Sequence, residues 1–157
     1  MAIYTPRFKP IYLYSNGTEN EIVTGGLTAY DYVTSTSSSI PKKPTISKGS
    51  TTMTISLPDA TGSSSGGTVF TENKIDLTKA KTIYLNVTNI TVDASSYVRF
   101  GVLATKENKY TFAAATTIRS NGTLSLDVAD LSGSYYLVIS MLGVWDKSVE
   151  FTEWWIE

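Results

Sequence analysis

The sequence predicts an all-β protein, an antiparallel and jelly-roll-like β-sandwich, and two observations carry this prediction. Short segments rich in β-branched and aromatic residues recur roughly every 8–12 residues, and glycine, asparagine, serine and threonine separate them. No segment keeps the apolar period of about 3.6 residues that marks an amphipathic helix, so we expect at most a single helical turn, near residues 77–81. With 157 residues, 41% of them hydrophobic, the chain has the size and composition of one domain with one core.

Alternation of apolar and polar side chains predicts half-buried strands in residues 52–57 and 82–90. The inward positions in these two segments are Met53, Ile55, Leu57, Ile83, Leu85 and Val87. Residues 135–142 are nearly all apolar, which is typical of a central strand covered on both faces. The last strand contains Trp154 and Trp155, which the period of two places on opposite faces, one in the core and the other at an interface or a ligand platform.

Turn-forming residues divide the remaining strands. Further strands are expected in residues 11–14, 27–33, 68–71, 98–104, 117–120 and 123–128. Asn121-Gly122 predicts a two-residue hairpin turn between the last two of these strands. Residues 63–67, rich in serine and glycine, predict a loop tip or a mobile flap. Gly101 inside a strand indicates a bulge or a close approach of backbone.

Residues 1–10 are predicted to form an extended arm that precedes a single sandwich domain of residues 11–157. Pro6 and Pro10 fix φ and remove backbone donors, so no helix or central strand can run through the arm. At about 3.3 Å per residue the arm reaches roughly 33 Å, far enough to lie on a neighbouring subunit. Its candidate attachment side chains are Tyr4, Arg7, Phe8 and Lys9. A frayed terminus is the alternative.

Charge and targeting patterns limit the partners that we expect. The first residues lack the apolar segment of a secretory signal, and no stretch reaches the roughly 20 apolar residues of a membrane helix. We therefore expect a protein that is made and kept in a cytoplasm, without a membrane partner. A formal net charge of −1 and 17% charged residues provide no basic field, so DNA and RNA are not expected as partners.

The composition removes most catalytic chemistry. The chain has no histidine and no cysteine, which excludes Ser-His-Asp and Cys-His nucleophiles, disulfides and thiolate zinc sites. A glycosidase with two carboxylates is left open, but the acidic residues are scattered over predicted loops and strand ends, where solvated surface groups are the rule. No glycine-rich segment ends in the Gly-Lys-Ser/Thr of a phosphate loop. We expect a non-enzymatic protein without a cofactor.

Calcium is the ion that the acidic residues suit best, since its ligands are carboxylate and carbonyl oxygens. Asp76, Asp127 and Asp130 are the candidate ligands, but no Asp-x-Asp-x-Asp spacing occurs. Asp76 also has a structural interpretation, because with Thr78 it can tie down backbone donors at a corner between strands. The prediction is no bound metal, with calcium as the alternative.

Aromatic side chains are the best candidates for a binding site. The chain has ten tyrosines and three tryptophans, and a ring beside polar groups can stack on the apolar face of a sugar. The candidate ligand-binding residues are Tyr30, Tyr32, Tyr110 and Trp145, with Asp146 as an adjacent acceptor. Packing in the core or at a subunit interface is the alternative use of each ring.

Five pieces of the sequence, taken in order, carry a resemblance to a known family. They are IYLYSNGTENEIVTGG (residues 11–26), TVFTENKIDLT (68–78), GVLATKE (101–107), LDVADLSGSYYLVI (126–139) and FTEWWIE (151–157). Together they resemble a sandwich domain of structural proteins from phages of Gram-positive bacteria, which are usually encoded among tail or other virion genes. Leu27 follows the paired glycines here, where that family commonly has tryptophan.

This resemblance implies a carbohydrate-binding-module-like fold on a virion assembled in the host cytoplasm, with no catalytic residues to carry over. We expect a phage structural protein, either a capsid decoration or head-fibre protein or a small tail component, that contacts host or environmental glycans. Its partners would be other capsid or tail proteins and copies of itself in a homo-oligomer, with a trimer as the first expectation. A free-standing carbohydrate-binding protein without a virion role is the alternative, and an enzyme comes third.

Overall fold

The computed structural model describes residues 13–15, 18–20, 27–30, 40–49, 52–58, 64–106, 112–143 and 146–157, which form strands and turns without a helix. The strands are β1 (Leu13–Ser15), β2 (Thr18–Asn20), β3 (Leu27–Tyr30), β4 (Ile40–Pro41), β5 (Thr45–Lys48), β6 (Met53–Leu57), β7 (Ser65–Thr71), β8 (Ile75–Asp76), β9 (Thr82–Thr91), β10 (Tyr97–Leu103), β11 (Ala114–Ile118), β12 (Gly122–Asp127), β13 (Ser134–Gly143) and β14 (Lys147–Ile156). The three longest, β9, β13 and β14, have ten residues each and occupy interior positions in their sheets.

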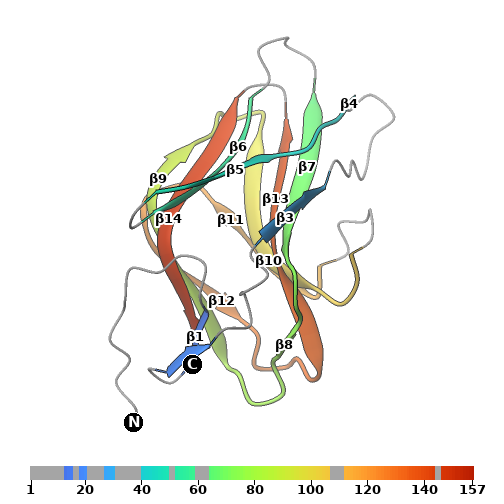
Figure 1. The fold of residues 1–157 in the computed structure, drawn as a ribbon, viewed down its shortest axis with the longest axis vertical. Helices are drawn as coiled ribbons and strands as arrows, with labels where there is room; N and C mark the ends of the chain where they lie inside the picture. Colours follow the sequence, from blue (N-terminus) through green and yellow to red (C-terminus); the bar gives the residue numbers. More distant parts are fainter. Residues whose placement is uncertain are drawn as a thin grey trace.

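The strands form two sheets that pack face to face as a β-sandwich (Figure 1). The first sheet has the order β12-β9-β14-β1-β2. β1 pairs with residues 154–156 of β14, whereas β6 pairs with residues 147–151 and β5 pairs with β6. The second sheet has the order β11-β10-β13-β7-β3, with β4 beside β7 and β8 beside β13. Nearly all neighbours are antiparallel, and the parallel pairs are β1 with β14 and β4 with β7.

The connections between the sheets follow jelly-roll order. Of the strands β6, β7 and β9 to β14, the first sheet holds β6-β14-β9-β12, and the second holds β7-β13-β10-β11. The first strand of this set therefore pairs with the last, and the second with the last but one, which is the arrangement of a double-sheet jelly roll. The predicted jelly-roll-like sandwich is confirmed.

The facing sides of the two sheets share one hydrophobic core. The inward positions predicted for β6 and β9 are all buried. In β13, Leu137 and Ile139 face this core, whereas Val138 lies on the opposite face in a smaller cluster with Phe70 and Leu103. β13 is therefore covered on both faces, as its nearly continuous apolar run predicted.

A bulge in β14 decides how its aromatic side chains face. The register between β14 and β9 shifts on both sides of Phe151. Because of these shifts, Phe151 and Trp154, three positions apart, both lie in the core at 0% and 1% exposure. Trp155 faces the other way and stacks on Tyr84, with ring centroids 5.1 Å apart. The two tryptophans thus lie on opposite faces, as the period of two predicted.

The predicted hairpin at Asn121-Gly122 is wrong. β11 pairs with β10 in the second sheet, whereas β12 pairs with β9 in the first, so these residues join strands of different sheets. Gly122 has a φ of +125°, a left-handed backbone that turns the chain from one sheet to the other. An Asn-Gly pair predicts a change of chain direction, but it does not say in which sheet the next strand finds its partners.

The loop tip predicted for residues 63–67 is also wrong for residues 65–67. Ser65 and the two glycines after it begin β7, pair with β13 and are buried. A Cβ atom on Gly67 would overlap the carbonyl oxygen of Lys42 in the segment that joins β4 to β5. The glycines therefore allow a close approach of two backbones, and they do not form a flexible tip.

The corner after β8 forms as predicted, but it contains no helical turn. The Asp76 carboxylate accepts hydrogen bonds from the backbone N–H and the hydroxyl of Thr78, at 2.9 and 2.6 Å. The Ala80 amide donates to the Leu77 carbonyl at 3.0 Å, which closes a turn of four residues.

Residues 1–10, with the attachment candidates Tyr4, Arg7, Phe8 and Lys9, lie outside the described residues. In the part of the chain that is described, no helix is long and apolar enough to cross a membrane.

Candidate functional site

Aromatic and charged side chains meet on the outward face of the second sheet, where β3, β7 and β13 lie side by side. The antiparallel register places Phe70 between Thr28 of β3 and Val138 of β13. Phe70 and Val138 are fully buried although they face away from the main core, and the partly buried Tyr30 and Tyr136 pack on the same cluster. We name one group of these side chains the tyrosine patch. Its members are Tyr30, Phe70, Glu72, Lys106 and Tyr136.

Phe70 fixes the orientation of the two tyrosine rings. Its centroid is 5.4 Å from that of Tyr30 at an interplanar angle of 82°, and 6.0 Å from that of Tyr136 at 86°. Both contacts are edge-to-face, an arrangement that the quadrupoles of the rings favour. Each tyrosine remains partly exposed, so the patch presents two oriented aromatic side chains to solvent.

Lys106 lies over both tyrosines. Its Nζ atom is 5.6 Å from the Tyr30 centroid and 4.9 Å from the Tyr136 centroid, within the range of cation–π attraction. The same atom lies 3.6 Å from the Glu72 carboxylate. Burial disfavours the charged form of Lys106, but the hydroxyl of Tyr30 and the charge of Glu72 favour it, and the net effect raises the pKa of Lys106. The lysine is therefore an ammonium group at neutral pH.

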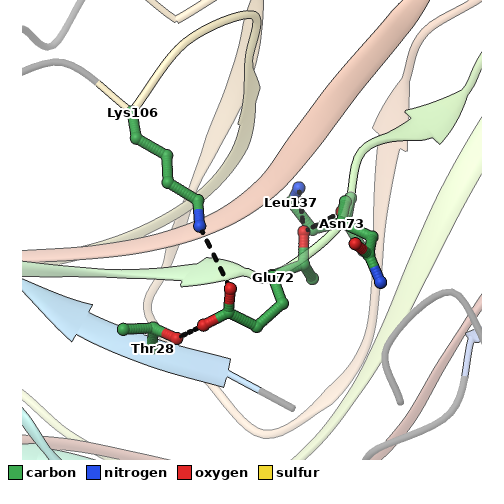
Figure 2. Close-up of polar contacts among 6 residues, drawn as sticks. Thr28, Glu72, Asn73, Lys106 and Leu137 are labelled. Atoms are coloured by element: carbon green, nitrogen blue, oxygen red, sulfur yellow. Dashed lines mark hydrogen bonds and ion pairs between the residues drawn. The ribbon is translucent and has the colours of Figure 1, made fainter. Parts of the chain in front are cut away.

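The turn after β7 holds Glu72 between β3 and the lysine, as Figure 2 shows. The Thr28 hydroxyl donates a hydrogen bond to Oε1 of Glu72, and the lysine approaches the other carboxylate oxygen. The buried Thr71 fixes the backbone of this turn. Its hydroxyl donates to the Asn73 carbonyl at 2.9 Å and accepts from the Leu137 amide at 3.1 Å (Figure 2). The carboxylate of the patch is thus held by its partners and by its backbone.

A second cation lies at the margin of the patch. Nζ of Lys74 is 5.3 Å from the centroid of the Tyr136 ring, so this ring has an ammonium group from each of two loops near it. The patch as a whole offers aromatic surface, hydrogen-bond donors and one acceptor carboxylate. This combination is typical of a site that binds a ligand.

Two of the described aspartates outside the patch have shifted pKa values, and both shifts are downward. Hydrogen bonds from Thr78 lower the pKa of Asp76. Burial by itself would raise the pKa of Asp93, but hydrogen bonds from Ser95 and Ser96 together outweigh it and lower the pKa. A general acid that works at neutral pH needs a raised pKa, so neither carboxylate suits that task.

Two of the three calcium candidates serve local turns. Asp76 bonds Thr78, and Asp127 accepts a hydrogen bond from the Ala129 amide at 2.9 Å. Asp130 is exposed in the turn after β12. Within the described ranges, no group of three or more acidic side chains gathers where it could hold a metal ion.

Of the candidate ligand-binding residues, Tyr30 lies in the patch. Asp146 is exposed directly before β14, in a connection that does not belong to the patch. The other three, Tyr32, Tyr110 and Trp145, lie outside the described residues.

Sequence reasoning missed Tyr136, Glu72 and Lys106. Tyr136 lies within the apolar run of β13, two residues before Val138. Alternate residues of a strand lie on the same face, so this spacing was the signal that Tyr136 faces away from Leu137. Glu72 and Lys106 follow closely after β7 and β10. Both strands run antiparallel to β13, so they end at the same edge of the sheet, and polar residues just beyond their ends are brought together.

Neither a scan against protein-family models nor a search of curated proteins gave a match for this chain. Among solved structures, the chain is similar to a low-affinity xylan-binding module, CBM86, from the gut symbiont Roseburia intestinalis. The TM-score is 0.46 and the sequence identity 9%, and the match covers 73% of this chain and 84% of that one.

Proposed function

We propose that this chain is a non-enzymatic recognition domain that binds a glycan through the tyrosine patch. The observation that carries the proposal is the position of two partly exposed tyrosine rings beside a carboxylate and an ammonium group on one sheet face. A sugar ring has apolar C–H faces and a rim of hydroxyls, so its binding needs aromatic surface and polar groups together.

Each member of the patch has a role in this proposal. Tyr30 and Tyr136 provide the surfaces on which a sugar packs, and Phe70 holds them in place. Glu72 accepts hydrogen bonds from sugar hydroxyls, and Lys106 donates to them. Because these side chains are ordered by contacts within the protein, binding loses less conformational entropy than it would with free side chains.

The proposal includes no catalytic step. Among the described residues of the patch, Glu72 is the one carboxylate, whereas glycoside hydrolysis by the usual routes employs a pair of carboxyl groups. The sequence provides no histidine or cysteine to act in place of the second carboxyl group.

A glycan array probed with the purified chain should identify a ligand, and isothermal titration calorimetry then tests the patch. Tyr30→Ala and Tyr136→Ala should each weaken binding about 10-fold or more, since each removes a packing surface for the sugar. Tyr84→Ala is the matched control, because Tyr84 is a half-buried tyrosine on the outward face of the other sheet. It should bind as tightly as the unchanged chain.

Four outcomes would contradict the proposal. Affinity that survives both patch substitutions, or that falls equally with Tyr84→Ala, would exclude the tyrosine patch as the site. An array without any ligand would contradict glycan binding itself. Hydrolysis of a bound polysaccharide by the pure protein would overturn its non-enzymatic character.

The setting that we propose is the surface of a phage particle, and its support is the ordered set of sequence pieces that resemble virion sandwich domains. In this setting the chain is a capsid decoration, head-fibre or small tail protein that docks through its arm. A chain without residues 1–10 should lose attachment to particles or its oligomeric state, as measured by co-sedimentation and light scattering. An unchanged result, with an unchanged circular dichroism spectrum, would favour a free-standing carbohydrate-binding protein.

A further inference from the structure

An open groove of about 290 Å³ lies between β10 and β11 on the outward face of the second sheet. Among the residues that the structure describes, the groove is lined by Arg99, Ala115, Thr116 and Thr117. Arg99 and Thr117 are partners in the β10–β11 register, so the two side chains lie next to each other on the same face. The groove therefore combines a cation with hydroxyl groups.

Arg99 is held in the groove by an aromatic ring. It is half-buried, and its guanidinium carbon lies 4.5 Å from the centroid of the Tyr97 ring, in cation–π contact. Across the described parts of the chain, the structure gives Arg99 neither a hydrogen bond nor an ion pair. A guanidinium group carries five N–H donors in a fixed fork, so this side chain can donate hydrogen bonds to an acceptor on a bound ligand.

We propose that this groove binds the carboxylate of an acidic sugar, and that Arg99 recognises it. The planar guanidinium matches a carboxylate through two parallel N–H···O bonds. The Thr117 hydroxyl lies beside this pair, where it can bond a hydroxyl of the same sugar. The groove is at the small end of ligand pockets, which range over roughly 300–1,000 Å³, and this size suits a single sugar unit.

The charges around the groove favour a group with a single negative charge. Arg99 is the one cation among the described residues that line the groove, so a monoanion balances it. Burial raises the pKa of Tyr97 more than the charge of Arg99 lowers it, so the phenol stays neutral and adds no opposing charge. A carboxylate fits this balance better than a phosphate monoester, which carries about −1.5 to −2 at neutral pH.

The groove is separate from the tyrosine patch. Arg99, Ser140, Thr68 and Tyr30 are successive register partners across the sheet. Three strand spacings, roughly 14 Å, therefore separate Arg99 from Tyr30. Ser140 and Thr68 between them are buried, at 0% and 3% exposure. Either site can bind or fail to bind without the other.

The test is an NMR titration of the full chain with sodium glucuronate, glucose and methyl phosphate. Glucuronate should shift the signals of the Arg99 side chain and the Tyr97 ring, and glucose should not. Arg99→Gln should weaken glucuronate binding about 10–100-fold, and Arg99→Lys about 10-fold, since lysine keeps the charge but loses the fork. Arg119→Gln is the matched control, because Arg119 is an exposed arginine just after β11 that does not line the groove.

The pKa of Tyr97 gives a second readout of the same event. The positive charge of Arg99 lowers this pKa, so a bound carboxylate that neutralises Arg99 should raise it. Four results would each overturn the proposal. They are a failure to bind glucuronate, equal binding of glucose, tighter binding of methyl phosphate, and unchanged affinity in a folded Arg99→Gln variant. Amide spectra of the variants establish that they are folded. None of these results depends on Tyr30 or Tyr136, so they leave the test of the tyrosine patch independent.

Discussion

Phe100→Ala should lower the free energy of unfolding by about 3–5 kcal/mol. Phe100 is at 0% exposure in β10 of the second sheet, and its ring centroid lies 6.3 Å from that of Trp154 in β14 of the first sheet. Truncation removes apolar contact between the two sheets and leaves a cavity that hydrogen-bonded strands cannot readily close. Urea denaturation, monitored by tryptophan fluorescence, measures the loss in the free energy of unfolding.

Phe112→Ala is the matched control for this prediction. The substitution is the same, but Phe112 is half-buried and packs on the smaller cluster of the outward face. Its ring lies so close to β10 that a Cβ atom on Gly101 would be 2.6 Å from its Cδ1 atom. We expect a loss less than half as large. Equal losses would mean that the core between the sheets is not the main source of stability.

Gly143→Ala should destabilise the protein by roughly 3–5 kcal/mol, because two separate penalties act at this position. Gly143 ends β13 with a φ of +142°, a backbone conformation that side chains with a Cβ atom rarely adopt. A Cβ atom there would also overlap Ser96, which is buried at the turn before β10. Thermal and urea unfolding of the variant measure the combined penalty.

Two other glycines separate the penalties at Gly143. Gly122 and Gly133 have φ values of +125° and +96°, and a Cβ atom on either would meet no atom within 4 Å. Gly122→Ala and Gly133→Ala should therefore cost only the backbone strain, about 1–3 kcal/mol. If all three variants lose the same stability, the overlap with Ser96 contributes nothing and the larger loss expected for Gly143→Ala is wrong.

The fold could be predicted from the sequence where a strand has one solvent-facing side and one buried side. In β6 and β9 the period of two identified the buried positions correctly, since a shift by one residue would expose the whole apolar set. Asn121-Gly122 shows the limit of local patterns. The residues predict a turn, but the pairing of β12 with β9 depends on contacts between segments far apart in the sequence.

The candidate site was less accessible to sequence reasoning. Tyr30 was identified because it lies in a short strand beside polar residues, but its partners come from β7, β13 and the segment after β10. Only the register of three strands, β7, β10 and β13, brings Glu72 and Lys106 next to Tyr136. Ser65–Gly67 illustrates the same limit, because a composition typical of a loop serves a close approach of two backbones.

Chemical-shift mapping of the protein in complex with a glycan checks the claim that the tyrosine patch is a glycan site. With the best ligand from the array, the largest amide shifts should fall at the end of β3, in the turn after β7 and around Lys106. Shifts centred on Tyr84 and Trp155, on the outward face of the other sheet, would contradict the claim.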